Sequence, residues 1–174
     1  MRRPSEIILN DGRSLQEAIK EHERWLNSSG QEGKRIKQLN GLDLHDVKFV
    51  NVDLRGVHFK CANLKNMIIN DCNFSGAIFN SSDMRNCIIK DSLFIESQMM
   101  NGKLNNCEIG NCDFHNSNVK HAIFVNGELY NNNFNDCQMR HCNFSKATIE
   151  ECSMIKSKVR KAKFMGTQFV NCTF

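Results

Sequence analysis

The 174-residue chain has little proline, tyrosine or tryptophan, with one of each, and it has no long hydrophobic run. No stretch approaches the roughly 18 to 20 consecutive apolar residues of a membrane-spanning helix, so the sequence predicts no membrane span. The opening residues, MRRPSEIILNDG, lack the apolar region of a secretory signal. These absences predict a soluble, cytoplasmic protein of bacterial type.

An excess of charge of one sign is also missing. The 23 Lys+Arg residues stand against 19 Asp+Glu residues, which gives a formal net charge of +4. Such a small excess does not by itself indicate nucleic-acid binding. The cysteine count of nine is odd and below the density of secreted disulfide scaffolds, so we expect free, reduced thiols. Apolar residues make up 40% of the chain, which is enough for a core and excludes a wholly disordered protein.

An uninterrupted apolar repeat with a period of five residues runs from Leu39 to Phe174. Each position of the repeat, here called a centre, is Leu, Ile, Val, Phe or Met, and all twelve phenylalanines are centres. Neither a helix nor a flat strand keeps residues five apart on one face. A chain that runs straight for a short piece and then turns a corner in every pentapeptide does keep them on the inside.

The residue two places before each centre shares its side of an extended piece, so it should also face inward. Between Ala62 and Cys172 this small position is mostly Ala, Ser, Gly or Cys, and it holds eight of the nine cysteines. Cys61 lies outside it, and we expect this thiol to be the most reactive. The residue two places after each centre is mostly Asn, Asp or Gly, which tolerate turn geometry.

The segments ANLKN (62–66), SDMRN (82–86) and SNVKH (117–121) closely resemble the A(D/N)LXX unit of the pentapeptide repeat family. The resemblance covers residues 39–174 and implies an all-β solenoid. Four units would form each 20-residue coil of a right-handed quadrilateral β-helix with about seven coils. Cys, Ser and Gly often stand where the family has Ala, and Phe or Ile where it has Leu. These substitutions keep the scheme of small and large residues.

Residues 1–38 precede the repeat and should form its N-terminal cap. The pattern at 6–9 predicts a short strand and that at 10–12 a turn. Ser14 and Glu17 then form the capping box of a helix. One face of this helix is apolar and consists of Leu15, Ala18, Ile19, His22, Trp25 and Leu26. We expect the helix to cover the open end of the first coil, with residues 27–37 as a polar link.

Candidate catalytic and metal-binding residues are explained by the repeat. Cys107 with Cys112, and Cys137 with Cys142, are spaced C-x4-C, and His141 adjoins the second pair. Zinc sites commonly use tighter pairs, whereas this spacing is the repeat period itself. No GxGxxG, phosphate-binding loop, HExxH or GxSxG motif occurs. We therefore expect no cofactor, no metal and no enzymatic activity.

Charged residues twenty positions apart should lie above one another on the same side of the solenoid. One side, the basic face, carries Lys120, His121, Arg140, His141, Lys158, Arg160 and Lys161. The opposite side, the acidic face, carries Asp71, Asp91, Glu108, Glu128, Glu150 and Glu151. The small net charge therefore conceals a dipolar rod, and we expect a protein partner to bind through these charged faces.

Nucleic acid is a poorer partner for this chain, because no exposed aromatic row accompanies the basic face for base stacking. The family resemblance implies one alternative function, since some members protect DNA gyrase and topoisomerase by mimicking duplex DNA. Mimicry requires a strongly acidic rod, whereas this chain is net positive. Secretion as a bacterial effector is a further alternative, for which the sequence holds no signal.

The final coil should present apolar residues at its open end. Its centres include Phe164, Phe169 and Phe174, which we take as a candidate dimer contact. Uncovered solenoid ends and open sheet edges both favour association. A twofold contact buries the same patch on both copies and closes without further growth. The sequence therefore predicts a homodimer through the C-terminal coil.

Overall fold

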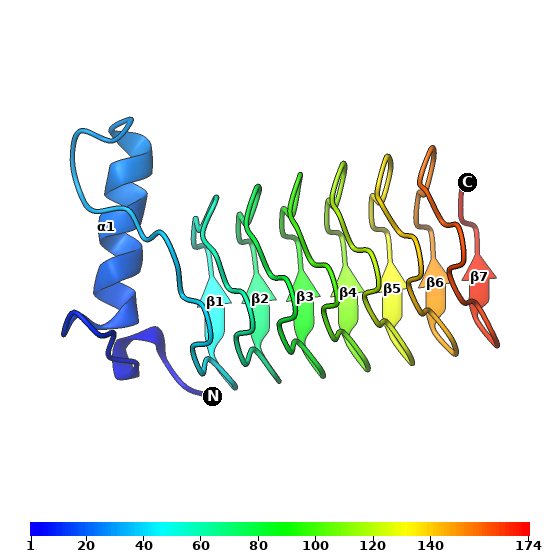
Figure 1. Cartoon of the computed structure of the whole chain (residues 1–174), viewed down its shortest axis with the longest axis horizontal. Coiled ribbons are helices and arrows are strands. Elements are labelled where there is room, and N and C mark those ends of the chain that lie inside the picture. Colours follow the sequence, from blue (N-terminus) through cyan, green and yellow to red (C-terminus); the bar gives the residue numbers. More distant parts are fainter.

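The pentapeptides fold into a rod of stacked coils with a helix at one end (Figure 1). The computed structural model describes all 174 residues. A short 3-10 helix, η1 (Pro4–Glu6), and the helix α1 (Leu15–Asn27) precede the coils. The strands are β1 (Lys48–Val50), β2 (Ile68–Asn70), β3 (Ile88–Lys90), β4 (Glu108–Gly110), β5 (Glu128–Tyr130), β6 (Thr148–Glu150) and β7 (Gln168–Val170). No helix is long and apolar enough to cross a membrane.

The seven strands form one parallel sheet in sequence order, and each lies one 20-residue coil after the last. Phe49 pairs with Ile69 in this register. The other three sides of each coil are joined by single parallel bridges, such as Gln38–His58, Asp43–Asn63 and Asp53–Asn73. Four bridged positions therefore recur in every coil, which confirms the predicted four-sided β-helix. Six full turns separate β1 from β7.

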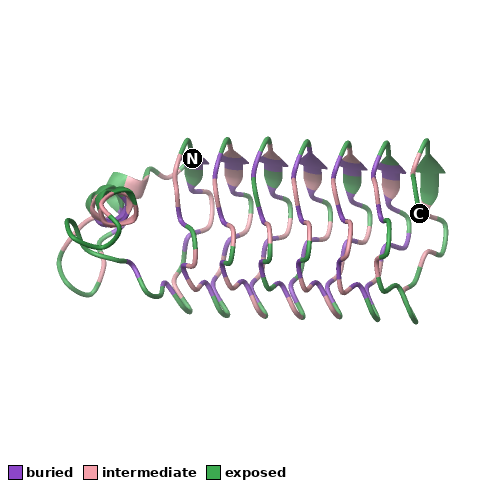
Figure 2. Ribbon diagram, turned by 90° about the horizontal axis from the view of Figure 1, so that it is seen from above, coloured by how far each residue is buried: buried purple, intermediate pink, exposed green.

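The centres of the repeat from Leu39 to Met154 are buried and form the core of the rod, whereas the last coil is more exposed (Figure 2). Because one position recurs once per coil, aromatic rings stack directly on one another. The rings of Phe94 and Phe114 lie 4.9 Å apart and those of Phe114 and Phe134 lie 4.7 Å apart, nearly parallel. Phe124 and Phe144 stack at 4.7 Å in a second column. The spacing matches that of neighbouring strands, about 4.8 Å.

The small position holds thiols that bond to the preceding coil. The Sγ atoms of Cys107 and Cys142 lie 2.9 and 2.8 Å from the main-chain carbonyls of Met84 and Val119, and donate to them. Burial raises the pKa of Cys142 to about 12. All nine cysteines are unpaired, and Cys61 is exposed, at a corner outside the core.

The corners of the coils use the left-handed backbone region. Asn66, Asn86 and Asn106 have φ values of 58°, 61° and 58°, a region that asparagine tolerates better than most residues. Their amides form a ladder in which Asn86 donates to Asn66 and Asn106 donates to Asn86, both at 3.1 Å. The position two after each centre is therefore a turn, as the sequence predicts.

The predicted capping helix is present as α1. Its capping box is complete, because the Ser14 N–H donates to the Glu17 carboxylate at 2.8 Å and the Glu17 N–H donates to Ser14 Oγ at 3.2 Å. The helix buries Leu15, Ala18, Ile19 and His22, whereas Trp25 and Leu26 are half-buried. These buried apolar residues belong to one continuous core with the centres of the coils.

The strand expected over residues 6–9 is wrong. The chain forms η1 instead, with the Arg3 N–H donating to the Glu6 carboxylate at 2.9 Å. Pro4 favours this turn because its fixed φ suits the first position of a helix. Only Ile8 makes a bridge, an isolated antiparallel one to Ser14. The turn expected at 10–12 is present.

Candidate interaction surfaces

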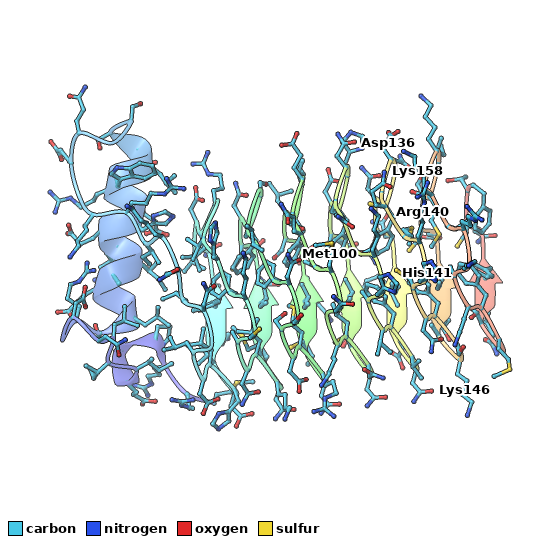
Figure 3. The ribbon with its side chains drawn as sticks, viewed as in Figure 1. Met100, Asp136, Arg140, His141, Lys146 and Lys158 are labelled. Carbon is cyan, nitrogen blue, oxygen red and sulfur yellow. The ribbon has the colours of Figure 1, made fainter.

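The basic face is built from adjacent columns of cations on the C-terminal coils (Figure 3). Lys120, Arg140 and Arg160 stand in one column, each one coil above the last. His121 and His141 belong to the next column. Their main-chain N–H groups donate to the main-chain carbonyls of Arg140 and Arg160 at 3.0 and 3.1 Å, respectively. The backbone ladder therefore brings the predicted side chains together and fixes their spacing.

The remaining members of the basic face extend these columns. Lys161 follows His141 in the corner column, and Lys158 lies beside it in a bridge with Gln138. All seven residues predicted for this face therefore lie on one side of the rod.

The two histidines of the basic face stack on each other. Their ring centroids are 4.7 Å apart and their planes differ by 12°. His121, His141 and Lys161 have φ values of 60°, 61° and 61°, and this corner column has Asn101 one coil earlier. Histidine and lysine occupy left-handed backbone less readily than glycine or asparagine. Two histidines and a lysine therefore follow one another in turn positions that glycine or asparagine fills more easily.

The cations of the basic face have no ion-pair partner. None of the seven residues takes part in a salt bridge. Asp136 stands at a corner of the coil, where its carboxylate is 3.9 Å from His115 Nδ1. Partial desolvation, together with His121 and the nearby Lys161, lowers the pKa of His141. The face is thus positive and uncompensated within the chain.

The acidic face lies on the side of the sheet, and it is partly neutralised. Lys90 Nζ is 2.7 Å from the Glu108 carboxylate. The Tyr130 hydroxyl donates to the same carboxylate at 3.4 Å, and the Asn111 amide donates to Asp91 at 2.9 Å. The remaining predicted acidic residues also lie on this side, namely Asp71, Glu128, Glu150 and Glu151. The two charged faces therefore differ in kind, because only the basic one lacks internal partners.

Two further lysines border the basic face. Counting charged residues along one side of the coils did not include them. Lys156 stands at the corner before it, with φ of 59°, and Lys163 lies on the next side, in a bridge with Asn143. Neither forms a salt bridge. The signal was present in the sequence, because Lys156 and Lys163 belong to the last coil and fall on the two sides that adjoin the basic face.

The predicted dimer contact is exposed at the end of the rod, as the colouring of the last coil shows (Figure 2). Phe174 is 73% exposed and Phe169 39% exposed, whereas Phe164 is half-buried. The ring of Phe169 lies 5.5 Å from that of Phe164 and 5.4 Å from that of Phe174. The structure thus brings the three rings into one apolar patch.

The thiols and histidines named as metal candidates do not gather into a site. No group of three or more His, Cys, Asp or Glu side chains is arranged to hold a metal ion. Burial raises the pKa of Cys112 to about 12 and that of Cys137 to about 11. A buried thiol with a raised pKa is a poor nucleophile, because the thiolate is the reactive form.

A parallel β-solenoid built from five-residue units, with charge arranged in columns on its outside, defines a class of repeat protein. The chain belongs to the pentapeptide repeat family, whose sequence model, described as pentapeptide repeats (8 copies), matches residues 38–76, 58–94 and 112–150. Proteins of this family are generally structural or interaction modules. No curated protein sequence matches the chain.

The chain is similar to solved structures of pentapeptide repeat proteins. A trypsin-treated variant of QnrB1, described as a plasmid-mediated fluoroquinolone resistance protein, is 17% identical, with a TM-score of 0.51 over 76% of this chain and 89% of that one. Rfr23 from the cyanobacterium Cyanothece 51142 is 13% identical, with a TM-score of 0.44 over 90% of this chain and 99% of that one. At 17% identity the likeness to QnrB1 extends to the fold alone.

Proposed function

We propose that the protein is a non-catalytic interaction module that binds an acidic protein partner through its basic face. The observation that carries the proposal is the ladder of unpaired cations on successive coils, from Lys120 to Lys161. Like charges stacked about 4.8 Å apart repel one another, which lowers the stability of the folded rod. An anionic partner removes that repulsion, so the arrangement favours a bound state over the free one.

The choice of a protein partner rests on what accompanies the cations. The single tyrosine, Tyr130, lies on the acidic face, where it contacts Glu108 and covers Gly110. The basic face therefore offers no exposed Phe, Tyr or Trp ring for stacking with bases, and its two imidazole rings, His121 and His141, stack on each other. Mimicry of duplex DNA, as in the alternative of gyrase protection, is disfavoured because Lys48 and Lys90 interrupt the acidic face. A reducing compartment such as the cytoplasm suits the nine unpaired cysteines.

A defined polyanion tests the proposal. The anisotropy of a labelled poly-glutamate peptide would be titrated with the protein, beside a labelled DNA duplex of equal length. We expect the peptide to bind, and the pair Arg140→Glu and Arg160→Glu to weaken its binding about tenfold, which corresponds to about 1.4 kcal/mol. The pair Lys103→Glu and Lys146→Glu makes the same charge change outside the basic face and serves as the control.

Two results would contradict the proposal. Equal weakening by the two pairs of substitutions would show that net charge alone, and not the basic face, holds the peptide. Tighter binding of the duplex than of the peptide would identify nucleic acid as the partner. Binding of the peptide should also strengthen as pH falls below about 6.5, the ordinary histidine value, because protonation of His141 adds a positive charge to the basic face. His141 gains its charge below that value, because its pKa is lowered.

A further inference from the structure

The outer edge of β1 is the only strand edge at the helix end of the rod, and its middle is unpaired. In later coils, the carbonyl of the third strand residue accepts a hydrogen bond from the preceding coil, as Asn70 does from the Asn51 N–H at 3.1 Å. No coil precedes β1. The N–H and carbonyl of Val50 and the carbonyl of Lys48 consequently have no hydrogen-bond partner, and Val50 is 39% exposed.

The N-terminal residues begin a strand on this edge but do not continue it. Arg2 runs parallel to β1, where its N–H donates to the Asp46 carbonyl at 2.8 Å and its carbonyl accepts from the Lys48 N–H at 3.4 Å. The chain then turns away into η1 at Pro4. The start of the edge is therefore paired by this chain, whereas its middle faces an open space.

That space is a groove of about 780 Å³ between α1 and the edge of β1. Figure 1 shows α1 at the β1 end of the rod with the N terminus beside it. The cations Arg3, Lys20 and Lys48 line the groove and form no salt bridge. Glu23 is its only acidic residue, and its carboxylate already accepts a hydrogen bond from the Asp53 N–H at 3.0 Å.

We propose that this groove binds an extended acidic segment of a partner protein, which adds a short strand to β1. The open main-chain groups of Lys48 and Val50 supply the backbone pairing typical of strand addition. The unpaired cations select carboxylates on one side of the segment. Ile19 and Val52, which also line the groove, contact the alternate side chains that point the other way. This proposal is independent of the basic face, which lies on the C-terminal coils.

A synthetic peptide tests the charge selection. The probe is a labelled, acetylated peptide of about six residues that alternates valine and glutamate, and its counterpart carries lysine in place of glutamate. We expect the acidic probe alone to bind, and Lys20→Glu with Lys48→Glu to weaken it about tenfold or more. The pairs Lys103→Glu with Lys163→Glu, and Arg140→Glu with Arg160→Glu, should leave it unchanged. Weakening by the latter pair would place the probe on the basic face and overturn the proposal.

Backbone pairing is tested separately. Alternate residues of a strand direct their N–H groups to the same neighbour, so N-methylation of the probe in one register should abolish binding, and in the other register should preserve it. Val50→Pro should also abolish binding, because it removes the open N–H while the Asn51 N–H still bonds to β2. Equal binding of both methylated probes would overturn the proposal, and this measurement requires no protein variant.

Discussion

Cysteine often stands in place of alanine at the small position, where it both fits the available space and donates a hydrogen bond. The side chain must be small, since the same position recurs directly above and below it in neighbouring coils. A thiol adds a donor that reaches a centre's carbonyl in the preceding coil, as Cys137 does to Phe114 at 2.9 Å. Thr167 makes the equivalent bond to Phe144 at 2.7 Å. Each pair thus links two coils in addition to the backbone ladder.

Large and small inward residues should differ sharply in their contribution to stability. Phe114 is fully buried between two stacked rings, so Phe114→Ala should lower the free energy of unfolding by about 3–5 kcal/mol. Cys112→Ala, in the same coil, removes one buried sulfur and should lower it by about 1 kcal/mol. Urea titration of both variants measures the difference. Equal losses would contradict the inward assignment of the centres.

Thiol reactivity should follow burial. We expect all nine cysteines to react with a disulfide reagent in the denatured, unreduced protein, because all are unpaired. In the native protein Cys61 should react first, since it is exposed, while Cys112 and Cys142 stay protected by burial and by pKa values raised to about 12. Fewer than nine reactive thiols after denaturation would show that a disulfide exists.

At the scale of the element, one buried histidine joins the helix to the link that follows it. His22 is completely buried, and its Nδ1 accepts a hydrogen bond from the Ile36 N–H at 3.2 Å. Its Nε2 is buried without a partner. Gly33 allows the link to turn back onto the helix. Its φ is 77°, and a Cβ at this position would lie 2.3 Å from the carbonyl oxygen of Glu21.

The cap should therefore be sensitive to mild acid. Burial lowers the pKa of His22 in the folded protein, so the unfolded chain takes up a proton first, near pH 6.5. Stability is fully present above that pH and is lost as pH falls through it toward the lower folded value. His22→Asn keeps an acceptor for Ile36 without a titrating ring.

The measurement is urea unfolding at pH 7.5 and at pH 5.5. The wild-type protein should lose more stability between the two values than His22→Asn does. The upper limit of the difference is about 1.4 kcal/mol for each pH unit below 6.5. Identical losses in the two proteins would show that His22 does not carry the acid response.

The coils were predictable from the sequence and the contacts of the cap were not. In the solenoid, residues twenty positions apart lie next to each other in adjacent coils. The sequence spacing alone therefore predicts that Arg140 lies between Lys120 and Arg160. No such spacing relates His22 to Ile36 or Arg2 to Val47. The groove beside β1 depends on those aperiodic contacts, and it therefore emerges only from the structure.

At the scale of the whole molecule, the exposed patch at the last coil should join two copies. Phe169 and Phe174 place their rings at the end of the rod, where the edge of β7 also has no strand beyond it. Burying this apolar surface favours association, and a twofold contact closes it. Light scattering at tens of micromolar should therefore give twice the monomer mass of 20.0 kDa. Phe169→Lys should shift the protein toward the monomer.

A monomeric wild-type protein would contradict this prediction. A dimer that Phe169→Lys does not weaken would place the contact elsewhere, and Val50→Lys at the other end of the rod is the matched control.

The coil register has a consequence for how such a protein can change length. Every centre is apolar. If one pentapeptide is removed, for example residues 122–126, apolar residues still fill every core position. Everything after the deletion, however, turns by a quarter of a revolution relative to what precedes it. Arg140 and Arg160 would then leave the side that holds Lys120. Gain or loss of whole coils keeps the columns of surface residues aligned. Gain or loss of a single pentapeptide moves surface residues to another side but leaves the core apolar.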